Sequence, residues 1–357
     1  MNDEVPMINL SNIDVNIFLL VYVGLAAGVL SGFAGVGGAF IVMPALIILG
    51  VPASFAVGTS LAWVTGNAII GAFRHRKLGN VDIKLGMIMV LAVMGGVEVG
   101  VRIINRIRDA GLADEVVLSI SICTLTIVGL YTFLESIRRK RHLDTMEGRG
   151  EFTPGVRTTV IPRKLQSINI PPVLKFAKAQ VSISLWIILA VGFTIGIIVG
   201  VMGVGGGFIM VPALFYLFGI PTFVAVGTDL FQIIFSAAYG SIRHAMSGNV
   251  IILISLIVLA ASSIGLQFGV LVTKYVRGVS VRFILGITIL MIAVGAVLKL
   301  LSILVNEFTS LLQTSSFVVT FSSAGLSVMM IIALYIMALR YRRGQCVPEF
   351  VKALLKR

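Results

Sequence analysis

The sequence predicts an all-α, polytopic membrane protein. It comprises two repeats of inverted topology, each with a glycine-rich broken helical hairpin, plus one extra C-terminal span. Two observations carry this prediction. The 357-residue chain is 58% hydrophobic and 12% charged, about half the charged fraction of a soluble globular chain, and its mean hydropathy is +1.06. Its apolar runs also form two similar series, and each series contains one dense glycine cluster.

The apolar runs mark the predicted helices. They fall at 15–34, 39–50, 54–73, 83–104 and 115–137, and then at 183–202, 207–218, 223–242, 250–273, 282–304 and 317–339. A helix over 39–50 or over 207–218 is only about 18 Å long, whereas a bilayer core is about 30 Å thick. We therefore expect a half-helix at each of these two places. The run at 317–339 has no counterpart and is expected to be an added span.

The second series repeats the first. Residues 35–46 (GVGGAFIVMPAL) align with residues 203–214 (GVGGGFIMVPAL), and residues 56–60 (AVGTS) align with residues 225–229 (AVGTD). Further matches pair Arg74 and His75 with Arg243 and His244. Because the agreement includes turn and polar residues, we interpret it as an internal duplication.

Lysine and arginine residues orient the predicted spans, since cytoplasmic loops are enriched in them. Basic residues follow the third run, fill the 138–180 segment and the tail, and separate the runs at 250–273 and 282–304; the N-terminus has acids but no bases before its first run. These inside and outside assignments are consistent with one another only if 15–34 and 39–50 are two separate crossings or half-crossings of the membrane. Each repeat then has an odd number of segments, and the second repeat is inverted.

The expected organisation follows from these boundaries. It is an extracytoplasmic N-terminus (1–14), a first membrane repeat (15–137), a basic cytoplasmic linker (138–180), a second membrane repeat (181–304), an extra transmembrane helix (305–339) and a basic cytoplasmic tail (340–357). We expect a multi-pass protein of the cell (plasma) membrane with a cytoplasmic C-terminus.

The net charge of +13 would suggest nucleic-acid binding in a soluble protein. Here the basic residues gather in loops and in the tail, where cytoplasmic orientation and anionic lipid account for them. We therefore expect anionic lipid at the cytoplasmic face and no nucleic-acid partner. The sequence contains no nucleophile elbow, Walker loop or metal-ligand cluster, so we expect no enzyme activity, no cofactor and no metal. The oligomeric state is left open.

The glycine clusters are the main candidate site. Glycine inside a helix costs about 1 kcal/mol relative to alanine, and unwound backbone in a membrane must be surrounded by protein or by a water-filled cavity. A half-helix that begins after either cluster points free N–H groups at the bend, an arrangement that binds anions. The alternative is close helix packing through small residues. The expected contacts are Gly35, Gly37, Gly38, Ala39, Gly203, Gly205, Gly206 and Gly207.

Polar residues that follow each cluster are expected to complete the substrate site. The hydroxyls of Thr59, Ser60 and Thr228 can donate to an oxyanion. Asp229 is one of few acids in an apolar run, where a charge costs about 3 kcal/mol or more. It could carry a coupling proton or cap a half-helix. The expected lining also includes Asn67 and Gln232.

Charged residues near helix ends have two interpretations. Arg74, His75, Arg243 and His244 end equivalent helices at opposite membrane faces; they are either vestibule charges that attract an anion or interfacial anchors. Glu98 lies in an apolar run, opposite Gln267 of the other repeat. It is either a proton relay, which would make it a second coupling candidate in addition to Asp229, or a hydrogen-bonded packing residue.

Together these motifs resemble the sulfite exporter TauE/SafE family. The resemblance rests on residues 32–38 (GFAGVGG), Pro44 and residues 58–60 (GTS), and on their echoes at 200–207 (GVMGVGGG), Pro212 and 227–229 (GTD). It covers roughly residues 15–300 and implies a permease for small sulfur oxyanions or organosulfonates, such as sulfite or sulfoacetate. Asp229 replaces the hydroxyl residue found at Ser60. Symmetric coordination would therefore need this acid to be protonated or turned away.

The predicted function is a membrane permease for small sulfur-containing anions, bound at the half-helix N-termini and moved by alternating access. Two alternatives remain open. One is a proton- or cation-coupled permease for another small solute, with Asp229 and Glu98 as binding residues. The other is a membrane assembly factor.

Overall fold

The computed structural model describes residues 7–10, 13–147, 170–276, 278–305, 308–343, 345 and 348. Within this part, nine helices are long and apolar enough to cross a membrane. They are α1 (Ile17–Ala34), α3 (Ala53–Lys77), α4 (Ile83–Asp109), α5 (Ala113–Glu147), α7 (Leu185–Met202), α9 (Thr222–Met246), α10 (Ile252–Thr273), α11 (Gly278–Leu304) and α12 (Thr309–Arg342). Two apolar helices are shorter, α2 (Ala39–Ile48) and α8 (Gly207–Tyr216). A helical, multi-pass membrane protein is confirmed.

Local sequence sets where these helices begin. Pro52 and Pro221 immediately precede α3 and α9, where the fixed φ of proline suits a helix start. Asn16 caps α1 by accepting a hydrogen bond from the amide of Phe18 (2.8 Å). Asp82 caps α4 in the same way. Side-chain acceptors of this kind satisfy amides that the helix itself leaves free.

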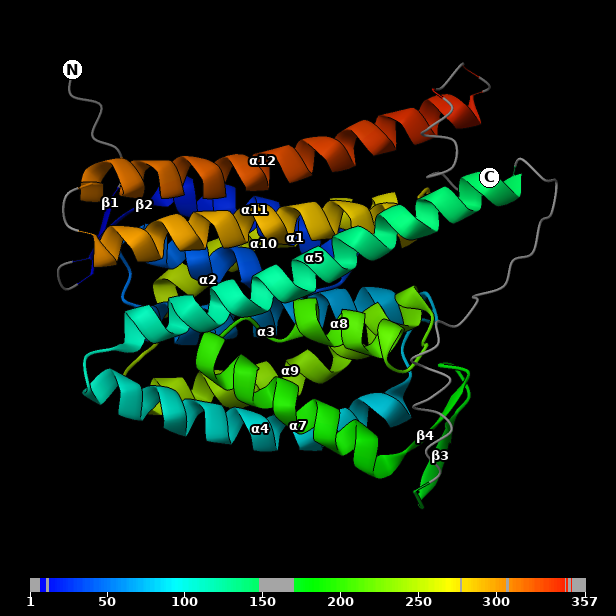
Figure 1. Cartoon of the computed structure of the whole chain (residues 1–357), viewed down its shortest axis with the longest axis horizontal. Helices are drawn as coiled ribbons and strands as arrows, with labels where there is room; N and C mark the ends of the chain where they lie inside the picture. Colours follow the sequence, from blue (N-terminus) through cyan, green and yellow to red (C-terminus); the bar gives the residue numbers. More distant parts are fainter. Residues whose placement is uncertain are drawn as a thin grey trace.

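The helices run roughly along the longest axis of the molecule, with α12 along one edge and α4 and α7 along the opposite edge (Figure 1). The main contacts join α1 to α10, α4 to α7, α3 to α9 and α5 to α11, and α12 packs on α11. Glycines make two of these contacts close. A Cβ atom at Gly28 would clash with the backbone of Ser262 in α10, and one at Gly196 with the backbone of Val93 in α4. Small residues allow such close approach of membrane helices.

Two short hairpins precede α1 and α7. Strand β1 (Met7–Leu10) pairs antiparallel with β2 (Ile13–Asn16), and β3 (Val173–Phe176) pairs antiparallel with β4 (Val181–Ser184). The hairpins lie at opposite ends of the helix bundle (Figure 1). The all-α expectation missed them because four-residue strands carry too little sequence for the two-residue period to be recognised.

Helix α5 is longer than its apolar run. It continues to Glu147, ten residues past the boundary expected at 137, because residues 138–147 are mostly charged or polar yet contain no glycine or proline. Hydropathy marks the end of an apolar run, whereas a helix stops only at a breaker or a cap. The expected linker and tail lie outside the described residues at 148–169 and 349–357.

Candidate functional site

A short glycine segment separates a long helix from a short helix in each half of the chain. The first glycine segment is residues 35–38, between α1 and α2, and the second is residues 203–206, between α7 and α8. The left-handed φ angles are +69°, +74° and +75° at Gly35, Gly37 and Gly38, and +69°, +66° and +80° at Gly203, Gly205 and Gly206. Residues with side chains rarely adopt this region, so both turns depend on glycine.

Backbone amides around both segments lack acceptors. The amides of residues 36–40 and 204–208 make no hydrogen bond to any residue that the structure describes; the first donors beyond them are Ile41, to Gly38 (3.1 Å), and Ile209, to Gly206 (2.9 Å). Residues 36–40 and 204–208 are all buried. Buried backbone donors are normally paired, so a cluster of unpaired ones marks a place for an acceptor.

The two glycine segments lie against each other. A Cβ atom placed on Gly207, the first residue of α8, would lie 2.5 Å from the carbonyl oxygen of Val36 and 2.8 Å from its Cα atom. The side chain of Val64 touches both segments, since its methyl groups lie 3.2 Å from a Cβ position on Gly37 and 3.0 Å from one on Gly205. The N-termini of α2 and α8 therefore meet in the interior of the bundle.

Helix α3 is bonded to both segments through one face. Ser60, Val64 and Asn67 are separated by four and three residues, which places them on the same side of a helix. The Ser60 hydroxyl donates to the carbonyl oxygen of Gly203 (2.7 Å), and Asn67 Nδ2 donates to that of Gly37 (3.3 Å). The Oδ1 atom of Asn67 is buried with no partner among the described residues. This face of α3 links the two halves at the site.

The equivalent face of α9 carries Asp229. Its side chain is fully buried, and its Oδ1 atom accepts a hydrogen bond from Gln232 Nε2 (3.0 Å). Its Oδ2 atom has no partner within the described part of the chain. Further along the same face, Ile233 lies 3.6 Å from a Cβ position on Gly37, and Ser236 donates to Gln232 Oε1 (3.2 Å). This face thus combines a carboxyl group with an apolar contact to the first glycine segment.

Thr59 and Thr228 hold helix starts of the opposite half. Thr59 Oγ1 accepts a hydrogen bond from the amide of Ile251, and Thr228 Oγ1 accepts one from the amide of Asp82, both at 2.9 Å. Ile251 and Asp82 immediately precede α10 and α4. A hydroxyl that accepts in this way keeps its proton for another bond. Donation to an oxyanion therefore stays a prediction for both residues.

The residues expected in the vestibules differ in exposure, because Arg243 is half-buried and the other arginine and the two histidines lie at the extremes. Arg74 is exposed, whereas His75 and His244 are 1% and 0% exposed. Successive helix residues point about 100° apart, so each histidine turns into the α3–α9 contact, where its Cβ lies beside Gly227 or Gly58. The expectation that these two histidines are vestibule charges is corrected by their burial.

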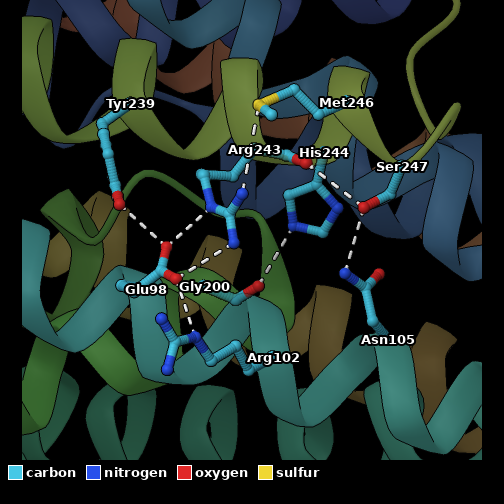
Figure 2. A network of polar contacts seen from close by, with 9 residues as sticks. All are labelled: Glu98, Arg102, Asn105, Gly200, Tyr239, Arg243, His244, Met246 and Ser247. Carbon is cyan, nitrogen blue, oxygen red and sulfur yellow. Dashed lines mark hydrogen bonds and ion pairs between the residues drawn. The ribbon is translucent and has the colours of Figure 1, made fainter.

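Glu98 lies in a polar network between α4 and α9 (Figure 2). Its carboxylate accepts hydrogen bonds from Arg243 Nε (2.7 Å) and Nη2 (3.0 Å), from Arg102 Nε (2.7 Å) and from the Tyr239 hydroxyl (2.8 Å). Nearby, His244 Nε2 lies 3.3 Å from the carbonyl oxygen of Gly200. Of the two interpretations of Glu98, the hydrogen-bonded role matches this geometry. Arg243 is an ion-pair partner and not a free vestibule charge.

Sequence reasoning missed three residues at the site. Ser31 accepts a hydrogen bond from Asn67 Nδ2 (2.6 Å), and Val64 and Ile233 contact the glycine segments. Each had a signal. Ser31 is a polar residue one helical turn before Gly35, and the two apolar residues occupy equivalent places in the repeats.

Comparison with known proteins identifies the family of the chain. Residues 20–298 match the family model described as Sulfite exporter TauE/SafE. The chain belongs to this family. The TauE/SafE match runs from α1 into α11, and so includes both glycine segments and the polar faces of α3 and α9.

Three proteins similar in sequence to this TauE/SafE chain are named probable membrane transporter proteins. YunE of Bacillus subtilis (strain 168) is 25% identical over 77% of this chain and 94% of its own length, and YjnA of the same organism is 25% identical over 65% and 84%. MJ0441 of Methanocaldococcus jannaschii is 26% identical over 55% and 60%. No solved structure matches the chain. Family and relatives together make this protein a membrane transporter.

Proposed function

We propose that this TauE/SafE protein is a permease for small sulfur-containing anions, such as sulfite or an organosulfonate, bound between the two glycine segments. The observation that carries the proposal is the meeting of two buried clusters of unpaired amides, at residues 36–40 and 204–208. Each cluster lies at a helix N-terminus, where the helix dipole adds about half a positive charge. Oxyanions are the ligands that such termini bind. The family description, sulfite exporter, supports the choice of a sulfur oxyanion.

The proposed mechanism is alternating access between two inverted repeats. Reciprocal packing supports it, because α1 packs on α10 while its counterpart α7 packs on α4, the counterpart of α10. The hairpins that precede α1 and α7 lie at opposite ends of the bundle (Figure 1), as an inverted pair requires. Burial of both segments fits a closed arrangement, which rocking of one half would open to one side.

The orientation we propose has the C-terminus in the cytoplasm of a plasma-membrane protein. The basic end of α3 (Arg74, Arg76 and Lys77) and Lys274 at the end of α10 support it. Cytoplasmic loops are enriched in such residues.

Asp229 is the proposed coupling residue. Ser60, its counterpart on α3, donates to the carbonyl oxygen of Gly203, and the matching carbonyl for Asp229 is that of Gly35. Only a protonated carboxyl can donate, so a proton on the unpaired Oδ2 atom would supply the missing bond. The same unpaired atom favours the second candidate, a proton- or cation-coupled permease for another small solute.

Flux in proteoliposomes tests the function. We expect the purified protein to move sulfite or a sulfonate such as sulfoacetate faster than empty liposomes do. We also expect it to move them faster than a carboxylate of similar size that contains no sulfur. Folded protein that moves none of these anions would overturn the proposal. Transport of a cation that Asp229→Asn abolishes would instead support the second candidate.

A matched pair of glycine variants separates the site from backbone strain. Gly37 and Gly79 have φ angles of +74° and +75°; Gly37 faces Val64 at the site, whereas Gly79 has no neighbour within 4 Å of its Cβ position among the described residues. We expect Gly37→Leu to abolish flux and Gly79→Leu to retain it. Equal flux in both variants would favour the packing interpretation of the glycines.

A further inference from the structure

The two halves differ in the partner of an equivalent arginine. Arg243 of α9 is paired with the carboxylate of Glu98 in α4 (2.7 and 3.0 Å). The matching residues are Arg74 of α3 and Gln267 of α10, and Arg74 Nη2 donates to Gln267 Oε1 (3.1 Å). An amide thus stands where the other half has an acid. The guanidinium of Arg74 keeps a hydrogen bond but has no carboxylate within ion-pair distance among the described residues.

This contact borders a surface pocket of about 470 Å³, which we call the Arg74 pocket. Its polar lining is Arg74, Lys77, Gln267 and Lys274, and none of the described residues that line it is acidic. All four side chains are exposed. The volume lies within the range of small-ligand sites. The pocket therefore offers three cationic groups and an amide to whatever enters it.

Helix dipoles do not cancel this charge. The C-terminal ends of α3 and α10, at Lys77 and Thr273, each contribute about half a negative charge. Two such ends offset about one of the three positive charges. The Lys77 ammonium lies 4.6 Å from the ring centroid of Phe73, a contact that stabilises a cation without neutralising it. The pocket therefore keeps a net positive charge. It also contains the planar guanidinium of Arg74, which can donate two parallel hydrogen bonds to one oxyanion.

We propose that the Arg74 pocket binds an oxyanion group, of the phosphate, sulfonate or carboxylate class, whose charge takes the place that Glu98 fills beside Arg243. The group comes either from a small soluble anion or from the headgroup of an anionic lipid. This site lies apart from the glycine segments and does not depend on what they transport.

Two substitutions in the full-length protein test the assignment. Gln267→Glu supplies the carboxylate that the other half already has, so Arg74 gains an internal partner and the pocket loses its ligand. Arg74→Gln removes the guanidinium group that would bind the oxyanion. The control is Arg76→Gln, which removes an exposed charge from the same helix end but not from the pocket lining. Melting temperatures are measured for all variants, and Gln267→Glu should melt at or above the wild-type temperature.

Two probes distinguish the source of the oxyanion. Sulfate is titrated calorimetrically into protein in phosphatidylcholine nanodiscs, and retention of phosphatidylglycerol is measured by native mass spectrometry. For at least one probe we expect binding to weaken about tenfold or more in Gln267→Glu and Arg74→Gln and to change less than about twofold in Arg76→Gln. Loss of sulfate binding identifies a soluble anion, and loss of lipid retention identifies a headgroup. Sulfate held by the glycine segments persists in every variant. Wild-type binding of both probes in Gln267→Glu and Arg74→Gln, or no binding by the wild type, would overturn the proposal.

Discussion

A single methyl group at Gly207 should separate the two glycine segments. In Gly207→Ala the new Cβ atom would lie 2.5 Å from the carbonyl oxygen of Val36. Atoms of this kind rest about 3.5 Å apart, and the clashing atoms belong to backbone, so the gap must widen by about 1 Å. The φ angle of Gly207 is not in the left-handed region. Alanine is therefore compatible with the start of α8 and improves its helix propensity by up to about 1 kcal/mol.

The displacement sets the size of the effect. An amide that would reach an anion at about 2.9 Å would lie about 3.9 Å from it, which is too far for a hydrogen bond. Hydrogen bonds to charged groups contribute about 1.5–3 kcal/mol. Losing one therefore weakens binding about tenfold to a hundredfold. Overpacking costs about 1–3 kcal/mol, part of which the helix gain offsets, so the variant should still fold.

Initial rates of sulfite flux from proteoliposomes, taken over a range of concentrations, measure this effect. We expect the KM of Gly207→Ala to rise at least about tenfold with a small change in melting temperature. The control is Gly95→Ala in α4; among the described residues its Cβ position meets only the ring of Phe193, at an ordinary 3.5 Å. A KM for Gly207→Ala equal to that of the control would refute the view that the facing amides form the substrate site.

Three further predictions concern the polar residues. Thr228→Val should cost about 1–3 kcal/mol because the buried amide of Asp82 loses its acceptor; the control Thr65→Val, which loses only a bond within α3, should show almost no shift in melting temperature. In double-mutant cycles on thermal stability, Glu98 should couple to Arg243 more strongly than to Arg102, since the Arg102 side chain is 70% exposed and the Arg243 side chain 30%; equal couplings would contradict this. Asp229→Asn should remove the dependence of flux on a pH gradient, and an undiminished response would exclude Asp229 as the coupling residue.

Much of the fold was predictable because hydropathy and glycine each act locally. Long apolar runs become membrane helices, and the runs at 39–50 and 207–218 correspond to the short helices α2 and α8. The missed features depend on distant contacts or on weak local signals. Strands β3 and β4 are stabilised by pairing with each other, and the polar end of α5 at 138–147 continues a helix that hydropathy cannot detect.

The candidate site was predictable at the backbone and less so at the side chains. Repeated glycines identified where the backbone turns, because few other residues adopt φ near +70°. The partner of each side chain depends on packing between the halves. Thr59 bonds to the amide before α10, 192 residues away, and Glu98 lies beside Arg243 only because α4 packs against α9. Helix periodicity gives the face on which a residue lies but not what that face meets.

The exchange of partners between α1 and α10, and between α4 and α7, has a consequence for biogenesis. During translation the first five helices leave the ribosome before either α7 or α10 has been made. The glycine-lined side of α1 therefore lacks its α10 partner until that helix is inserted. Neither half is a complete folding unit, because α4 must wait for α7 and α1 must wait for α10, which ends at Thr273.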